Sequence, residues 1–245
     1  MKSTSLALAL TGLAFMLAVI WGSPLIRILK HFRIGKLIRM EGPQSHITKM
    51  GTPTMGGAMI IAPVALLTIL LNGASLVGLN VLGRSIMLPL LVMILFFILG
   101  AIDDWEGVRG PRRGLGMRAR TKFLLQTILA IGTAFALRYL LDAPELYWPG
   151  AEEEISLGAW YIPVAAFVIV GTSNAMNFTD GLDGLAGLIA ATCFVAYGAI
   201  AILQGQVFIA RFCFTIVGAL FGFLWFNVHP AQLFMGDTGS IPLGA

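Results

Sequence analysis

Charged residues are scarce in this chain. Asp, Glu, Lys and Arg make up 11% of the 245 residues, 58% are hydrophobic, and the mean hydropathy is +0.88. A soluble domain carries about 25% charged residues, so the composition excludes that class. Several apolar runs reach the roughly 18–20 residues that cross a bilayer as a helix. The runs are continuous rather than alternating, which disfavours a transmembrane β-barrel.

Cysteine and net charge are also low, and each excludes a kind of site. Cys193 and Cys213 are the two cysteines, and each lies in an apolar run without a neighbouring His or Cys. We expect both to be buried small hydrophobic residues rather than a disulfide or metal ligands. The net charge of +4 is too small and too dispersed to indicate a nucleic-acid partner. The first apolar run is long enough to span the bilayer and lacks a cleavage pattern, so it is not read as a signal peptide.

The expected fold is an all-α, polytopic transmembrane helical bundle that forms a single domain over residues 1–245. We expect about seven complete spans and the start of an eighth, which begins near Asp237. The expected spans are residues 6–29, 55–71, 85–102, 123–141, 159–173, 185–203 and 208–227. No closing loop follows the last apolar run, so the sequence is expected to be a fragment that is incomplete at its C-terminus.

The distribution of Lys and Arg predicts the orientation in the membrane. Basic residues concentrate in cytoplasmic loops. Placing the loops 30–54 and 103–122 inside, and counting Arg27 with the first, makes 12 of the 16 basic residues cytoplasmic. The acidic loop 142–158 then lies outside, while 174–184 and 228–240 lie inside. Every polar motif described below therefore falls on the cytoplasmic face, although none was used to assign the orientation.

Two adjacent acids, Asp103 and Asp104, directly follow a long apolar run. Neighbouring carboxylates repel each other unless a cation neutralises them. Magnesium prefers oxygen ligands, so the pair predicts a Mg²⁺ site or a general base. The alternative is a solvated pair that ends a helix.

The most polar stretch of the chain is Ser173–Gly184. Asn174, Asn177, Asp180 and Asp183 recur every three residues, a spacing that on a helix places side chains along one drifting face. We expect this stripe to form one wall of a binding site. The alternative, in which Asp180 or Asp183 caps the next helix, explains one acid but not two acids and two amides.

Two glycine-containing motifs complete the polar set. Asp237 lies among small residues in Gly236–Ser240, where it is either functional or a helix N-cap, and Phe234 nearby has a ring that can stack on a base. The Thr48–Gly57 loop, with Lys49, has backbone N–H groups and an ammonium that suit phosphate; such loops also commonly just enter a helix. Acids, a lysine and basic loops on one membrane face favour metal-assisted phosphoryl transfer to a lipid.

Four motifs resemble one enzyme family. They are Gly42–Gly57, Asp103–Asp104, Asn174–Gly187 and Phe223–Ser240. Together they resemble the bacterial phospho-N-acetylmuramoyl-pentapeptide transferases, members of the polyprenyl-phosphate N-acetylhexosamine-1-phosphate transferases. The resemblance runs from about residue 20 to the end of the chain, with the motifs in the family's order. It implies transfer of phospho-MurNAc-pentapeptide from UDP-MurNAc-pentapeptide to undecaprenyl phosphate, which yields lipid I and UMP in peptidoglycan synthesis.

The resemblance also implies a Mg²⁺ cofactor, a location in the bacterial inner membrane and, at the family level, a homodimer. Asp237 resembles the Mg²⁺ ligand, and Asp103 resembles the base that deprotonates the lipid phosphate, with Asp104 beside it as a further metal and catalytic candidate. The residues that resemble the nucleotide-binding wall are Asn177, Asp180, Gly181, Leu182 and Asp183, with Phe234 stacking on uracil. Those that resemble polar groups around the diphosphate and sugar are Lys49, Thr54 and Lys122.

The chain departs from the family pattern in two places. Met50 stands where many members carry a basic residue, and the family continues well beyond Ala245 with a histidine-rich loop that helps form the site. We therefore expect the 245-residue chain to be inactive alone and the full gene product to be a transferase. The alternatives are a UDP-GlcNAc:polyprenyl-phosphate transferase, a cation or proton transporter, whose acids should lie in the middle of spans, and a non-catalytic scaffold.

Overall fold

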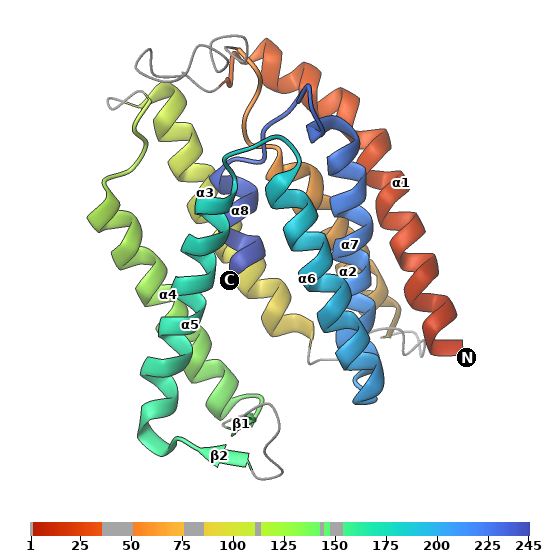
Figure 1. The fold of residues 1–245 in the computed structure, drawn as a ribbon, viewed down its shortest axis with the longest axis vertical. Coiled ribbons are helices and arrows are strands. Elements are labelled where there is room, and N and C mark those ends of the chain that lie inside the picture. The colour runs from red at the N-terminus through yellow and green to blue at the C-terminus, as the bar shows by residue number, and fades with distance from the viewer. Residues whose placement is uncertain (1, 36–50, 76–85, 111–113, 143–144, 148–153) are drawn as a thin grey trace.

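The computed structural model is a helical bundle and describes all residues except 1, 36–50, 76–85, 111–113, 143–144 and 148–153 (Figure 1). The described part contains eight α-helices and one short β-ribbon. The helices are α1 (Lys2–His31), α2 (Gly57–Ser75), α3 (Met87–Arg109), α4 (Ala119–Tyr139), α5 (Tyr161–Thr179), α6 (Leu185–Leu203), α7 (Val207–Asn227) and α8 (Asp237–Gly244). Strands β1 (Glu145–Tyr147) and β2 (Glu154–Ser156) pair antiparallel, and a 3₁₀ turn, Gly158–Trp160, leads into α5.

Each predicted span corresponds to a helix, so the all-α expectation is confirmed, but the number of spans is not. Five described helices are long and apolar enough to cross a membrane: Ser5–His31, Met87–Arg109, Gly158–Thr179, Leu185–Leu203 and Val207–Asn227. The apolar part of α2, Gly57–Leu71, is shorter. Helix α4 carries Arg120, Lys122, Gln126 and Arg138, which lower its hydropathy. The chain is therefore built from several apolar helices, and the expected count of seven spans is not confirmed.

Helices α1 and α7 pack closely because glycines line their contact. A Cβ atom added to Gly218 would lie 2.1 Å from the carbonyl oxygen of Thr11, and one added to Gly222 would lie 2.5 Å from the Cβ of Ala18. The Thr11 hydroxyl donates a hydrogen bond to the carbonyl oxygen of Phe214 at 3.0 Å. Small residues four apart let helix backbones approach, and packing of this kind drives helix association within lipid.

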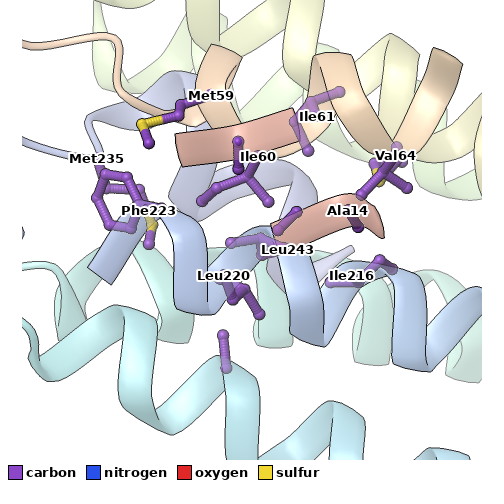
Figure 2. Close-up of a cluster of buried hydrophobic side chains, with 14 of the residues drawn as sticks. Ala14, Met59, Ile60, Ile61, Val64, Ile216, Leu220, Phe223, Met235 and Leu243 are labelled. Carbon is purple, nitrogen blue, oxygen red and sulfur yellow. The ribbon is translucent and has the colours of Figure 1, made fainter. Parts of the chain in front are cut away.

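Helix α8 occupies the interior of the bundle, where it contacts α2, α3 and α5 (Figure 1). Its surroundings include a large apolar core in which Met59, Phe223 and Met235 are completely buried (Figure 2). A second buried cluster joins Phe96 of α3 and Ile241 of α8 to α4 and α5. Because this short helix is enclosed by longer ones, its first residue, Asp237, is held in a defined place in the bundle.

The two cysteines have different environments. Both are free, as expected, and Cys213 is buried in α7. Cys193 is exposed on the surface of α6, so the expectation that both would be buried is wrong for Cys193. An apolar residue needs no cover on a helix face directed at lipid, and hydropathy alone does not distinguish that face from the core.

The α1–α7 contact predicts the effect of adding one methyl group. Gly218→Ala places a Cβ against the Thr11 backbone and should lower the apparent unfolding temperature in detergent by roughly 3–10 °C. Gly132→Ala on α4 is the matched control, because no atom lies within 4 Å of its added Cβ. The control should unfold at or slightly above the wild-type temperature, since alanine favours a helix. Equal unfolding temperatures for the two variants would contradict close α1–α7 packing.

Candidate active site

Four helices place polar side chains together at the end of the bundle where α3, α5 and α7 finish. Asp103 comes from α3, Lys122 from the first turn of α4, Asn177 from the last turn of α5 and Asp237 from the start of α8. These residues are far apart in the sequence, and each follows or precedes a long apolar segment. The apolar segments bury one another, and the polar residues at their ends meet as a consequence.

Lys122 joins two of the acids. Its ammonium donates to Asp103 Oδ2 at 3.0 Å and to Asp237 Oδ2, and its side chain is only 16% exposed. Burial alone would lower the pKa of Lys122, but the charges and hydrogen bonds of Asp237 and Asp103 outweigh it, so the pKa lies above its ordinary value. The lysine is therefore a permanent positive charge between two carboxylates.

Asp237 has a partner on each carboxylate oxygen. Oδ2 accepts from Lys122, and Oδ1 accepts from Asn177 Nδ2 at 2.7 Å. Burial alone would raise the pKa of Asp237, but the charge of Lys122 and the hydrogen bonds that Lys122 and Asn177 donate hold the pKa below its ordinary value. Asp237 is thus ionised at neutral pH, with its orientation set by α4 and α5.

Asp104 holds the beginning of α8. Its Oδ1 accepts from the backbone N–H of Asp237 at 3.2 Å, and its Oδ2 accepts from the backbone N–H and the hydroxyl of Thr238. The first N–H groups of a helix have no partner within the helix, so a carboxylate from α3 caps α8 across the bundle. The alternative of a solvated pair that ends a helix is wrong, because α3 continues to Arg109 and both acids are bonded.

Two glycines allow the backbone of α8 to reach this position. A Cβ atom at Gly100 of α3 would lie 2.1 Å from the carbonyl oxygen of Asp237. One at Gly57 of α2 would lie 2.2 Å from the backbone nitrogen of Gly239. The N–H groups of Gly56 and Gly57 donate to the carbonyl oxygens of Phe234 and Met235, so they hold this loop and are not free to bind phosphate.

A cavity of about 250 Å³ opens beside these side chains. Its polar lining comes from Thr54, Asp103, Asp104, Lys122 and Asp237. The described residues include no group of three or more His, Cys, Asp or Glu side chains that could enclose a metal ion by themselves. Magnesium is commonly bound by one or two carboxylates together with substrate phosphates and water, and Asp237 beside an open cavity suits that mode.

Asp180 and Asp183 lie beyond the end of α5, which finishes at Thr179, so the expected helical stripe holds only for Asn174 and Asn177. Gly184 has a φ of 79°, a backbone conformation that favours glycine and separates α5 from α6. Asp180 Oδ2 accepts from the N–H of Gly236 at 3.1 Å. Neither acid caps α6, whose N-cap is Gly184.

Asp183 bonds the same segment that contains Phe234. Its Oδ2 lies 3.0 Å from His229 Nδ1 and accepts from the N–H of Ala231 at 3.3 Å. Asp180 and Asp183 together therefore tie the end of α5 to residues 229–236, which lead into Asp237. The predicted nucleotide-binding residues and the predicted metal ligand thus belong to one connected polar network.

The remaining predicted residues occupy the edges of this network. Thr54 is buried and lines the cavity, whereas Gly181 and Leu182 are exposed in the turn after α5. Phe234 is partly buried, and its backbone N–H donates to the carbonyl oxygen of Pro53. Asn174 bonds Gln126 of α4 rather than the reacting cluster. Lys49 lies outside the described residues.

Three polar residues of the network were missed by reading the sequence. Gln126 is fully buried beside Asn174, Ser240 accepts from Asn177, and Asn227 joins the N–H of Gly184 to the carbonyl oxygen of Leu233. Gln126 had a usable signal, because a lone amide within an apolar span needs a partner. Asn227 and Ser240 lie within the Phe223–Ser240 motif, but no pattern around them gave either side chain a role of its own.

The shared cation predicts a clear effect on stability. Lys122→Met leaves Asp103 and Asp237 without their positive partner and should lower the free energy of unfolding by about 1–3 kcal/mol at neutral pH. Lys122→Arg retains the charge and is the control, with a smaller loss. The measurement is thermal unfolding in detergent. Unfolding of Lys122→Met at the wild-type temperature would contradict the role of Lys122 as the bridging charge.

Comparison with known proteins identifies the family of this chain. The family model described as glycosyl transferase family 4 matches residues 86–245. A phospho-N-acetylmuramoyl-pentapeptide-transferase of Chloroflexus aurantiacus is 44% identical over 98% of this chain and 65% of its own length. Proteins of the same name from Geobacillus sp. and Oceanobacillus iheyensis are 43% and 40% identical, over 70% and 73% of their lengths. This chain therefore spans 65–73% of the length of these relatives. It belongs to glycosyl transferase family 4 and, within it, to the phospho-N-acetylmuramoyl-pentapeptide transferases.

Proposed function

We propose that the full gene product transfers phospho-MurNAc-pentapeptide from UDP-MurNAc-pentapeptide to undecaprenyl phosphate, giving lipid I and UMP. The observation that carries this proposal is the Asp103–Lys122–Asp237 cluster, which faces a cavity at the end of an apolar bundle. A site at the end of membrane-spanning helices is accessible both to a lipid phosphate and to a water-soluble nucleotide. The names of the relatives support the same reaction.

The reaction exchanges one phosphorus–oxygen bond for another. An oxygen of the lipid phosphate attacks the phosphorus that carries the sugar, and the bond from that phosphorus to the bridging oxygen of the diphosphate breaks. UMP leaves with the bridging oxygen, and the lipid diphosphate linked to the sugar is the second product. The protein contributes by positioning the two phosphates and by stabilising negative charge in the transition state.

Asp103 is the proposed base. Its carboxylate faces the cavity and can accept the proton of the lipid phosphate, while Lys122 and the N–H of Met117 hold it in place. Lys122 is already positioned between carboxylates, and in the substrate complex its ammonium can turn to the incoming diphosphate. A charge that neutralises Asp237 in the free protein thus becomes available to the substrate.

Asp237, with Asp104 beside it, is the proposed magnesium site. Asp237 presents an ionised carboxylate at the cavity, whereas the Asp104 oxygens already accept hydrogen bonds from the start of α8. Magnesium bound there would neutralise the diphosphate and polarise the reacting phosphorus. Because the described residues form no closed metal cage, we expect the ion to bind together with the nucleotide substrate.

The nucleotide is proposed to lie along the turn after α5. Asn177, Asp180, Gly181, Leu182 and Asp183 form this wall, and Phe234 is proposed to stack on the uracil ring. Support comes from the bonds of Asp180 and Asp183 to residues 231–236, which keep the turn and the Phe234 segment together. Thr54, Asn174 and Lys49 are proposed polar groups around the diphosphate and sugar.

The lipid acceptor is proposed to reach the site from the membrane. An apolar groove of about 490 Å³ runs between α4 and α5, with Phe123, Phe167 and Phe178 in its lining and Asn174 as a polar group within it. The excess of Lys and Arg in the loops at this end predicts that it faces the cytoplasm, in the bacterial inner membrane. UDP-linked substrates would meet the enzyme on that side.

The transfer reaction predicts metal-dependent release of UMP. The purified full gene product, given UDP-MurNAc-pentapeptide, undecaprenyl phosphate and Mg²⁺, should release UMP, and EDTA should abolish the release until Mg²⁺ is restored. UDP-GlcNAc should neither replace nor compete with the muramoyl substrate. Lipid-linked product from UDP-GlcNAc alone would overturn the substrate assignment, and transport in liposomes without any UMP would overturn the reaction class.

Asp237→Asn and Asp180→Asn separate the metal from the nucleotide. Asp237→Asn should weaken Mn²⁺ binding, measured by electron paramagnetic resonance at saturating nucleotide, and lower kcat by roughly 1,000-fold. Asp180→Asn retains an oxygen that can accept from Gly236, so it should fold normally, keep Mn²⁺ binding and weaken nucleotide binding by roughly tenfold. If both variants lost Mn²⁺ binding equally and kept nucleotide binding, this division of roles would be wrong.

A further inference from the structure

Gln126 is a polar side chain completely enclosed in the α4–α5 interface. It follows Lys122 by one helical turn, so both project from the same face of α4. Its Oε1 accepts a hydrogen bond from Asn174 Nδ2 of α5 at 3.0 Å. The two helices are therefore joined by an amide pair one turn away from the reacting cluster.

The orientation of the two amides follows from a third group. Asn174 Nδ2 also lies 2.8 Å from the carbonyl oxygen of Val170, which can only accept, so the Asn174 atom at this position must be nitrogen. A nitrogen donor can bond only the oxygen of Gln126, which directs Gln126 Nε2 elsewhere. Within the described part of the chain, Nε2 is buried without a hydrogen-bond partner.

An unmade buried hydrogen bond makes Gln126 a costly choice for stability alone. Leaving a buried donor unpaired costs about 1–3 kcal/mol, whereas an apolar side chain of the same shape is nearly neutral. Asn174 would still bond Val170 if Gln126 were replaced. The presence of an amide at this position therefore has to be explained by something other than the stability of the fold.

The geometry of Asp237 supplies that explanation. Lys122 of α4 bonds Asp237 Oδ2, and Asn177 of α5 bonds Asp237 Oδ1, so the orientation of the carboxylate depends on how the two helices are aligned. Asn177 lies one turn after Asn174 on α5, as Lys122 lies one turn before Gln126 on α4. The amide pair therefore connects the same two helices that hold the two oxygens.

The rest of the nearby interface cannot set this alignment as sharply. The buried residues that α4 and α5 contribute around it, Ala130, Ala166, Ile169 and Val170, are all apolar. Apolar contacts are non-directional and tolerate sliding of one helix along the other. A hydrogen bond between two buried amides has a defined length and direction, so it specifies the register of α4 against α5.

We infer that Gln126 is a positioning residue that, through Asn174, fixes the register of α4 and α5 and thereby aims Lys122 and Asn177 at Asp237. This role rests on the proposed transfer reaction for its consequence in catalysis. It does not place Gln126 in contact with substrate, and the part of the proposed nucleotide wall that follows α5 is held by the separate bonds of Asp180 and Asp183. The expected signature is a loss in turnover without a loss in nucleotide affinity or stability.

Gln126→Met in the full gene product is the test, since methionine has a similar size and no amide. We expect kcat for UMP release to fall by roughly 10–100-fold, because displacements of about 1 Å have effects of this size. KM for UDP-MurNAc-pentapeptide should change less than twofold, and the unfolding temperature should stay within about 3 °C. Unchanged kcat, or kcat and unfolding temperature falling together, would overturn the positioning role.

Two further variants show whether the effect belongs to the amide pair. Thr133→Val removes a polar group from the same face of α4, two turns from Gln126, and should leave kcat unchanged. Gln126→Met combined with Asn174→Leu should be no slower than the slower single variant, because groups that act as a unit are not additive. A product of the two single losses would show that the residues act independently and would contradict the inference.

Hydrogen exchange tests the structural role of the Gln126–Asn174 bond independently of the transfer reaction. In Gln126→Met, backbone amides of residues 172–178 should exchange roughly tenfold faster than in wild type, while those of α1 and α7 should not change. If the wild-type protein released no UMP, the proposed transfer would be wrong. The exchange rates would then still show whether the Gln126–Asn174 bond fixes the register of α4 and α5. Unchanged exchange at residues 172–178 would overturn the positioning role of Gln126, whichever reaction the protein catalyses.

Discussion

The ammonium of Lys122, placed between the carboxylates of Asp103 and Asp237, is the interaction on which the polar end of the bundle depends. Two acids this close, in an apolar surrounding, would repel each other without a cation. The lysine joins three helices in one contact, α3, α4 and α8. The same charge is what the diphosphate of the proposed substrate would need, so under the proposed reaction one residue would serve both the free protein and the substrate complex.

A second constraint is the close approach of backbones around α8. Gly100 and Gly57 leave room for the helix start, and Asp104 accepts the N–H groups exposed there. The two adjacent acids therefore have different roles. Asp103 pairs with Lys122, and Asp104 caps α8, the helix that begins with Asp237. A side chain as small as alanine at either glycine would move Asp237 away from Lys122 and Asn177.

Much of the fold was predictable, because each apolar run is long enough to form a helix and each predicted span corresponds to one. The boundaries of the helices were less predictable. The expected run 85–102 ends before Asp103, whereas α3 continues through both acids to Arg109, since buried hydrogen bonds compensate their polarity. The expected stripe from Asn174 to Asp183 breaks after Thr179, and Gly184, with its positive φ, allows the chain to turn into α6. The exposure of Cys193 was not predictable either, because lipid-facing and core-facing positions have the same hydropathy.

The sequence by itself determined the class of protein, the polar motifs and their gathering at one end of the bundle, because hydropathy and charge act locally along the chain. The tertiary structure alone decided the pairing of Lys122 with Asp103 and Asp237, the capping of α8 by Asp104 and the Gln126–Asn174 bond. Each of these joins residues between 19 and 134 positions apart. Such contacts depend on how helices pack and in which register, and no local pattern of residues specifies that.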